Sequence, residues 1–236
     1  MAELGRGGDA DAILARVYWA GVDVGGKRKG FHVAVVASSS RGLQLSLNGH
    51  VAGRDAAAAV LSLLERFSPR VVAVDSPRRP APVGETQRPC EHSLTAAVRC
   101  GITGTRDEDT IAARQDHYYE WIQEGWKLYE TLEQAPSWTV IECFPTATWA
   151  RLDRVRPRDV SRERWSEDIL QQKLVEPGLL GGLPTRRNQD LRDAIGAAYT
   201  ARLYSQRGKT ETFTCPDCDL LPHCGIVVPR LASRPA

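Results

Sequence analysis

Residues Val17 to Gly26, with the sequence VYWAGVDVGG, decide the fold. This apolar run contains one acid, Asp23, and ends at a Gly-Gly pair, which is the pattern of a buried strand entering a turn. Two further apolar segments follow, Phe31 to Val36 and Leu43 to Leu47. Strand, glycine turn and strand in this order predict an antiparallel meander of three strands, the first of which carries a carboxylate.

The rest of the chain predicts helices packed on additional strands. Short apolar strands are expected at Val71 to Val74 and at Trp138 to Glu142. Helices are expected over Arg54–Phe67, Cys90–Cys100, Ile111–Leu132, Thr146–Leu152, Arg164–Leu174 and Gln189–Tyr204. A helical crossover after the meander returns the chain to the sheet. The sequence therefore predicts an α/β fold whose mixed sheet has three antiparallel strands, with parallel strands added alongside, flanked by helices.

The composition is that of a globular protein. Of the 236 residues, 42% are hydrophobic and 25% charged, and the net charge of +2 is too small to indicate nucleic-acid binding by itself. No apolar stretch approaches the roughly 20 residues of a membrane span, and residues 1–16 resemble a loose leader rather than a signal peptide. We therefore expect a cytoplasmic protein without a membrane partner. Residues 17–206 are expected to form one domain with a helical insertion near 90–135, and residues 207–236 a Cys-rich tail.

Four carboxylates occupy positions where an unpaired charge is costly. Asp23, Asp75 and Glu142 lie at the last residues of apolar strands, where sheets present ligands, and Asp193 precedes an apolar helix face. One such acid is common because it can cap a turn or a helix, but four indicate a shared site. Crowded carboxylates repel each other unless a cation neutralises them. Mg²⁺ and Mn²⁺ prefer oxygen ligands and keep waters for a phosphate substrate, so the pattern favours divalent-metal chemistry on phosphate.

Neighbouring polar residues have simpler explanations. Asp190 lies in the first turn of the last long helix, where an interaction with the helix dipole explains it as well as a role in the site does. His32 alternates along the second strand and is interpreted as structural. Ser76 follows Asp75, and turn hydrogen bonding is its default role, with a contribution to a metal site as the alternative.

The segments that contain the four acids, taken in their order along the chain, resemble a family of predicted nucleases. This family is catalogued as domain of unknown function 429 and belongs to the ribonuclease H-like superfamily. The resemblance covers roughly Val17 to Tyr204. It rests on four motifs, which are GVDVGG (21–26), VDSP (74–77), ECFP (142–145) and DLRDA (190–194). The paired acids of the last motif also resemble those of Holliday-junction resolvases, in which a late helix supplies acids to the metal site.

The resemblance implies a fold, an activity and a set of site residues. The fold would be ribonuclease H-like, and the activity would be hydrolysis of nucleic-acid phosphodiester bonds by water activated at bound Mg²⁺ or Mn²⁺. The implied catalytic metal ligands are Asp23, Asp75, Glu142 and Asp193, with Asp190 beside them. Glu91 also resembles a recurring family position, although its only evident physical role is to open a helix.

Two other functional classes remain open from the sequence. Actin-like ATPases and sugar kinases also begin with an Asp-x-Gly phosphate turn, and Lys27 could be its basic residue. Such proteins generally need two domains, and this chain shows no second Asp-x-Gly-Gly loop. The other class is a non-catalytic interaction protein that keeps only the fold, but the presence of all four acids argues against it.

The tail carries a separate signal. Cys215 and Cys218 form a Cys-x-x-Cys pair, followed by His223 and Cys224. Two thiolates with this spacing can hold Zn²⁺, and His223 or Cys224 could add a third ligand. Adjacent residues rarely both reach one tetrahedral ion, so a fourth ligand would have to come from elsewhere. A reduced Cys cluster without metal is an equally good interpretation.

A basic strip follows Glu142. Residues 151–164 contain six Arg against three acids. A solvated helix and loop surface explains this composition. The alternative is a patch that faces the phosphates of a nucleic acid and whose binding falls with salt.

Overall fold

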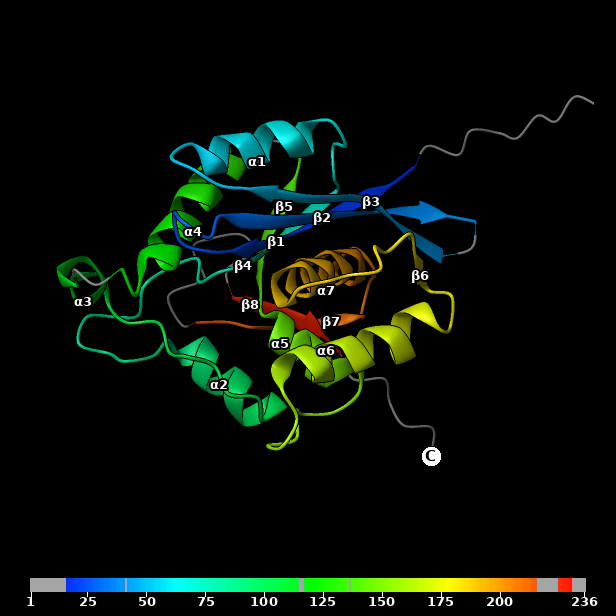
Figure 1. Ribbon diagram of the computed structural model, residues 1–236. Coiled ribbons are helices and arrows are strands. Elements are labelled where there is room, and N and C mark those ends of the chain that lie inside the picture. Colours follow the sequence, from blue (N-terminus) through cyan, green and yellow to red (C-terminus); the bar gives the residue numbers. More distant parts are fainter. Residues whose placement is uncertain (1–15, 41, 115–116, 136, 216–224, 231–236) are drawn as a thin grey trace, which may run out of the picture.

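One mixed sheet forms the centre of the computed structural model (Figure 1). The structure describes residues 16–40, 42–114, 117–135, 137–215 and 225–230. The eight strands lie in the order β6-β3-β2-β1-β4-β5-β8-β7. Their bounds are β1 (Tyr18–Val24), β2 (Phe31–Ser39), β3 (Gly42–Val51), β4 (Val71–Asp75), β5 (Thr139–Cys143), β6 (Leu180–Gly181), β7 (Thr210–Phe213) and β8 (Ile226–Pro229).

The first three strands form the expected meander. β1 pairs antiparallel with β2, and β2 pairs antiparallel with β3, with a bulge between Val35 and Val36. The turn from β1 to β2 is closed by the Gly25 amide, which donates to the Gly30 carbonyl over 3.0 Å. Gly30 has a φ of +71°, a conformation that glycine adopts at little cost. The glycines after Asp23 therefore do form the turn that the sequence predicts.

Parallel strands extend this meander on one side. β4 pairs parallel with β1, β5 with β4, and β8 with β5. An antiparallel β3-β2-β1 unit continued by parallel β4 and β5, with helices on both faces, is the ribonuclease H-like arrangement. The predicted fold class is confirmed.

Helices cover both faces of the sheet. In Figure 1, α7 lies against one face with α5 and α6 beyond it, and α1 and α4 lie on the other. The helix bounds are α1 (Ala56–Glu65), α2 (Pro89–Val98), α3 (Glu108–Ala113), α4 (Glu120–Leu132), α5 (Pro145–Leu152), α6 (Arg162–Leu170), a π-helical turn (Gln171–Val175) and α7 (Gln189–Tyr204).

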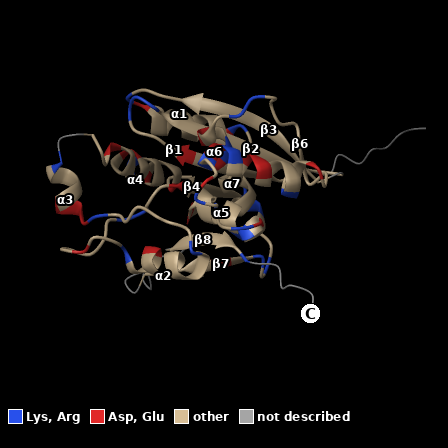
Figure 2. Ribbon diagram, turned by 60° about the horizontal axis from the view of Figure 1, so that its bottom comes forward, with Lys and Arg blue, Asp and Glu red and all other residues tan. Residues whose placement is uncertain are grey.

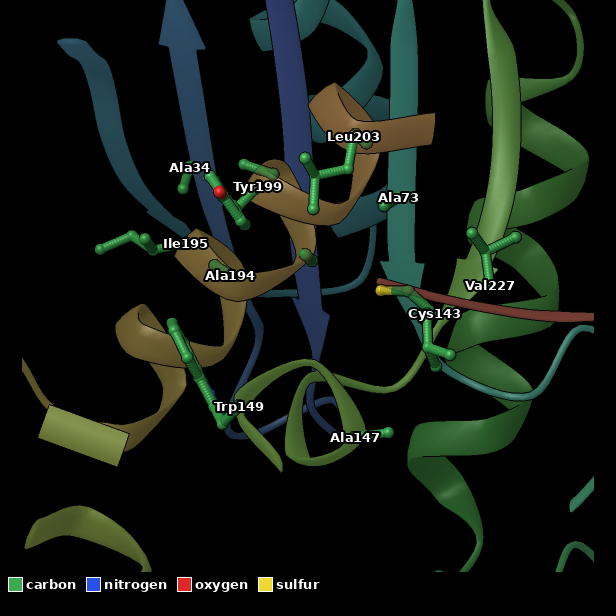
Figure 3. Close-up of a cluster of buried hydrophobic side chains, with 14 of the residues drawn as sticks. Ala34, Ala73, Cys143, Ala147, Trp149, Ala194, Ile195, Tyr199, Leu203 and Val227 are labelled. Atoms are coloured by element: carbon green, nitrogen blue, oxygen red, sulfur yellow. The ribbon is translucent and has the colours of Figure 1, made fainter. Parts of the chain in front are cut away.

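The helix α7 packs unusually close to the sheet. A Cβ atom at Gly21 would lie 2.1 Å from the Ala194 carbonyl oxygen, so the backbones of β1 and α7 approach each other where both side chains are minimal. Figure 3 shows this apolar layer, in which Ala73, Ala194 and Ile195 fill the space between sheet and helix. Because the Ala side chains of α7 are small, the helix lies close to the sheet. This brings the acids of α7 close to those of β1 and β4.

Two features differ from the expectations. The segment 111–132 is not one helix, because α3 ends at Ala113 and α4 begins at Glu120. Residues 207–236 do not form only a tail, since β7 and β8 extend the sheet beyond β5. The apolar run Ile226–Pro229 lies in the expected tail but pairs with both β5 and β7. In the described part of the chain, no helix is long and apolar enough to cross a membrane.

Candidate metal centre

Three carboxylates converge at the carboxyl ends of β1 and β4. Asp23 and Asp75 are register partners on these parallel strands. Each acid lies two residues after one that faces α7, namely Gly21 and Ala73, so both side chains point to the α7 side of the sheet. Asp193 meets them from α7, and one carboxylate oxygen of each residue lies within 4.8 Å of the others. The structure therefore brings together three of the four acids that the sequence singles out.

Burial and mutual repulsion make these acids hard to ionise. The pKa of Asp23 is raised to about 7, first by burial and then by the nearby charge of Asp193, while Lys29 opposes the shift. Burial, followed by the charge of Asp23, raises the pKa of Asp75 well above its usual range. The Oδ2 atom of Asp23 is buried and has no hydrogen-bond partner within the described residues. A divalent cation would favour the ionised form of these acids and could bind the unpartnered oxygen, so the residues fit a divalent metal.

Asp193 is held in place by donors from three elements. The Gln189 amide donates to both carboxylate oxygens over 2.9 and 3.0 Å, and the Trp149 indole donates to one over 3.3 Å. Arg162, at the start of α6, forms an ion pair of 2.9 Å with Oδ2. Burial raises the pKa of Asp193, but the charge of Arg162 and the Gln189 hydrogen bonds oppose this. Arg162 therefore supplies a positive charge directly beside the carboxylate cluster.

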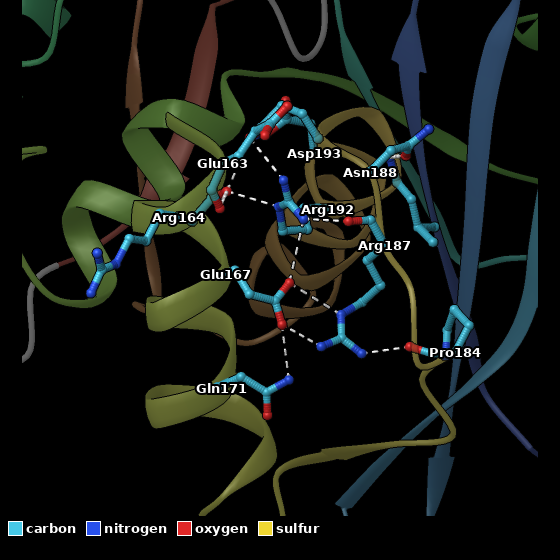
Figure 4. A network of polar contacts seen from close by, with 12 residues as sticks. Glu163, Arg164, Glu167, Gln171, Pro184, Arg187, Asn188, Arg192 and Asp193 are labelled. Carbon is cyan, nitrogen blue, oxygen red and sulfur yellow. Dashed lines mark hydrogen bonds and ion pairs between the residues drawn. The ribbon is translucent and has the colours of Figure 1, made fainter. Parts of the chain in front are cut away.

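A polar network behind α7 orients Gln189. The Ser166 hydroxyl donates to the Gln189 side-chain oxygen over 3.1 Å and accepts from Arg192 over 2.9 Å. Because its oxygen is engaged in this way, the amide nitrogen of Gln189 faces Asp193. Arg192 and Arg187 share the carboxylate of Glu167, which fixes the start of α7 against α6 (Figure 4). The network thus holds the Asp193 carboxylate in one orientation.

A second group of ligands adjoins the first. Asp23, His32 and Asp190 also have potential ligand atoms within 4.8 Å of one another. Lys29 forms an ion pair of 2.7 Å with Asp190. The pKa of His32 is lowered, mainly by burial, so its ring is neutral near pH 7 and can act as a ligand. Asp23 belongs to both groups, so the second group directly adjoins the first. The sequence pattern did not indicate that His32 lies beside the acids.

Glu142 is placed differently. Along β5 it shares its side of the sheet with Val140, which packs in the core under α1 and α4, whereas Ile141 and Cys143 face α7. Its carboxylate is bound by the buried guanidinium of Arg88, over 2.9 and 2.5 Å, and by the Arg78 amide over 3.0 Å. Glu142 therefore does not belong to the three-acid cluster, although it lies at the same end of the sheet.

Arg88 connects Glu142 to Glu91. Its Nε and Nη2 atoms donate to Glu91 over 3.0 and 2.9 Å, and its backbone amide donates to the same carboxylate. Thr105 completes the shell of Glu91 through its amide and its hydroxyl. Glu91 thus caps the start of α2, in agreement with its predicted role of opening a helix, and it also binds Thr105, which sequence spacing does not indicate as a partner. This buried network anchors α2 to the end of β5.

The basic strip divides between two environments. Arg151, Arg154 and Arg164 pair with the acids Glu211, Asp153 and Asp168, away from the cluster. The other three Arg residues border a cavity that Asp75 also lines. They are Arg156, Arg158 and Arg162. Elsewhere acidic and basic residues are interspersed along the ribbon (Figure 2).

The zinc prediction falls mostly outside the described residues. Cys218, His223 and Cys224 are not among them, whereas Cys215 is half-buried beside Cys90. A hydrogen bond with the Cys90 thiol lowers the pKa of Cys215 to about 7. Zinc binding by the four residues thus stays a prediction.

The fold and the cluster define a ribonuclease H-like domain with a buried group of carboxylates. No protein-family model matches this chain, and no curated protein matches it either. Membership of the family suggested by the motifs therefore stays a prediction. Among solved structures, the chain is similar to one described as "T. thermophilus RuvC in complex with Holliday junction substrate". The identity is 18% and the TM-score 0.46, over 81% of this chain and 96% of the other.

Proposed function

We propose that this protein is a metal-dependent nuclease that hydrolyses phosphodiester bonds. The observation that carries the proposal is the cluster of Asp23, Asp75 and Asp193, which contains a buried carboxylate oxygen without a partner in the described chain. Ionising three crowded, buried acids is costly unless a cation neutralises them, and Arg162 and Lys29 supply only part of that charge. Mg²⁺ or Mn²⁺ is the natural cation for an all-carboxylate site. The motifs that resemble the predicted-nuclease family support the same activity.

Each residue has a distinct part in this proposal. Asp23, Asp75 and Asp193 would hold the metal, with Asp190 and His32 available for a second ion through the shared Asp23. When bound, such ions activate water and stabilise the charge that develops on phosphate. Arg162 and Lys29 border the acids and can bind the phosphate oxygens of a substrate. Glu142, which is held by Arg88, is not among the proposed ligands.

The substitution Asp23→Asn tests the proposal. It keeps the size of the side chain but removes the charge that both ligand groups share, so we expect cleavage of nucleic acid with Mn²⁺ to fall by about two orders of magnitude or more. Mn²⁺ binding, measured by calorimetry, should weaken in parallel. The matched control is Asp55→Asn, because Asp55 is exposed and its side chain makes no cap hydrogen bond.

The assay should include single-stranded, duplex, RNA–DNA hybrid and branched substrates. Undiminished metal-dependent cleavage by Asp23→Asn would reject the mechanism. Hydrolysis of ATP without any cleavage of nucleic acid would favour the actin-like alternative instead.

A further inference from the structure

A cavity of about 540 Å³ opens beside the carboxylate cluster. Its floor is the end of the sheet, where Asp75 and Ser76 follow β4. Residues 99–103 after α2 line the cavity, as do Val155, Arg156 and Arg158 from the connection between α5 and α6 and Arg162 at the start of α6. Pockets of roughly 300 to 1,000 Å³ enclose small organic ligands, so this one has room for a nucleotide.

The rim of this cavity carries positive charge that the protein itself does not neutralise. Arg99 and Arg158 both line it, and both are exposed. Neither has an ion-pair partner in the part of the chain that the structure describes. Arg156 donates to a backbone carbonyl, and Arg162 holds Asp193. Exposed guanidinium groups that line a cavity are suited to bind phosphate oxygens.

The interior offers apolar and aromatic surface. Trp121 and Phe144 line the cavity and are half-buried. Val155 adds an apolar side chain that is 40% exposed. Trp165 also lines the cavity but is buried, and its indole donates to the Arg154 carbonyl. Aromatic faces next to a charged rim are the elements with which proteins bind unstacked bases of single strands.

We propose that this cavity receives one unstacked nucleotide of a single-stranded or unpaired nucleic-acid segment. Its base would stack against Trp121 or Phe144, and its phosphates would contact Arg99 and Arg158. The inference rests on the proposed nuclease function, because Asp75 borders the cavity and the adjoining phosphodiester then reaches the acids. A base paired inside a duplex remains in its stack and cannot enter, so the preferred substrate class is single-stranded or contains unpaired positions.

Binding without metal tests this inference separately from cleavage. A fluorescein-labelled single-stranded octanucleotide, the same sequence as a duplex, and a single strand with a central abasic position are titrated with the protein in EDTA at fixed salt. Fluorescence anisotropy gives the three Kd values. We expect the intact single strand to bind about tenfold more tightly than the other two, the range that one stacked base contributes.

Three variants assign the effect to the cavity. Arg158→Gln should raise the Kd of all three probes about fivefold because it removes a phosphate contact. Trp121→Ala should abolish the difference between the intact and the abasic strand, and Trp121→Phe should restore most of it. Arg164→Gln is the control, because Arg164 pairs with Asp168 outside the cavity and should leave binding unchanged.

The outcomes separate the two proposals. Equal affinity for duplex and single strand, or an Arg158→Gln variant that binds like the wild type, would overturn the inference even if the protein cleaves duplex DNA. Single-strand binding through the cavity without any cleavage would support the inference and remove the nuclease function. Tight binding of a mononucleotide but not of the octanucleotide would overturn the polymer substrate and assign the cavity to a small phosphate ester.

Discussion

Asp23 combines burial, repulsion and a missing partner in one side chain. In the folded protein its pKa is about 7, far above that of an Asp in an unfolded chain. Ionising it therefore destabilises the fold. Without metal, stability should be highest below the unfolded pKa near 4 and should fall as the pH rises to about 7, because the folded state binds more protons.

Thermal unfolding in EDTA at pH 5 and pH 8 measures this effect. Asp23→Asn should be more stable than the wild type at pH 8 by on the order of 2 kcal/mol, and the advantage should shrink toward pH 5. Saturating Mn²⁺ should reverse the order, because only the wild type gains from the ion. An advantage that is the same at both pH values would contradict the raised pKa.

The guanidinium group of Arg162 partly neutralises the acids when no metal is bound. Its ion pair with Asp193 occupies an oxygen that a metal would also use. Removing the guanidinium leaves the cluster more negative, so Arg162→Gln should lower the Kd for Mn²⁺ about three- to tenfold in calorimetry. The Arg164→Gln protein should bind Mn²⁺ like the wild type. Weaker Mn²⁺ binding by Arg162→Gln would mean that Arg162 orients Asp193 more than it competes with the ion.

At the level of elements, contact between β1 and α7 sets the distance between the acids. A Cβ atom on Gly21 would meet backbone atoms of Ala194 and Ala198 at 2.1 and 2.2 Å, and backbone cannot yield as a flexible side chain can. We expect Gly21→Ala to destabilise the protein by about 3 kcal/mol or more, measured by denaturant unfolding. Gly101→Ala is the control, because nothing lies within 4 Å of its Cβ position, and its cost should stay within about 0.5 kcal/mol.

Glu142 connects α2 to β5 through Arg88, so we expect its substitution to change the stability of the protein but not its metal binding. Glu142→Gln weakens a buried ion pair with Arg88 and should cost about 1–3 kcal/mol of unfolding free energy. It should leave the Kd for Mn²⁺ unchanged, since Glu142 lies outside the cluster. In contrast, Asp75→Asn should raise the Kd for Mn²⁺. Loss of Mn²⁺ binding in folded Glu142→Gln would return Glu142 to the set of metal ligands.

At the scale of the whole molecule, the sheet gathers residues from both ends of the described chain. The parallel strands β4 and β5 end beside β1, and α7 returns across them about 170 residues after β1 begins (Figure 1). The strands β7 and β8 extend the sheet on the far side of β5, although the sequence there resembled a tail. Residues 99–103, which follow α2 between β4 and β5, line the cavity.

Local sequence determined the meander, the glycine turn, the acids at strand ends and the bounds of α7, because hydrophobic period and turn residues act over a few neighbouring positions. Only the tertiary structure decided which acids share a site. Asp23 and Asp75 are register partners and face α7. Glu142 pairs with Val74, one residue before Asp75, and therefore points to the other side of the sheet. Such register depends on pairing between distant strands. The partners of Asp193 and Glu142, namely Arg162 and Arg88, are likewise fixed by contacts that sequence spacing does not encode.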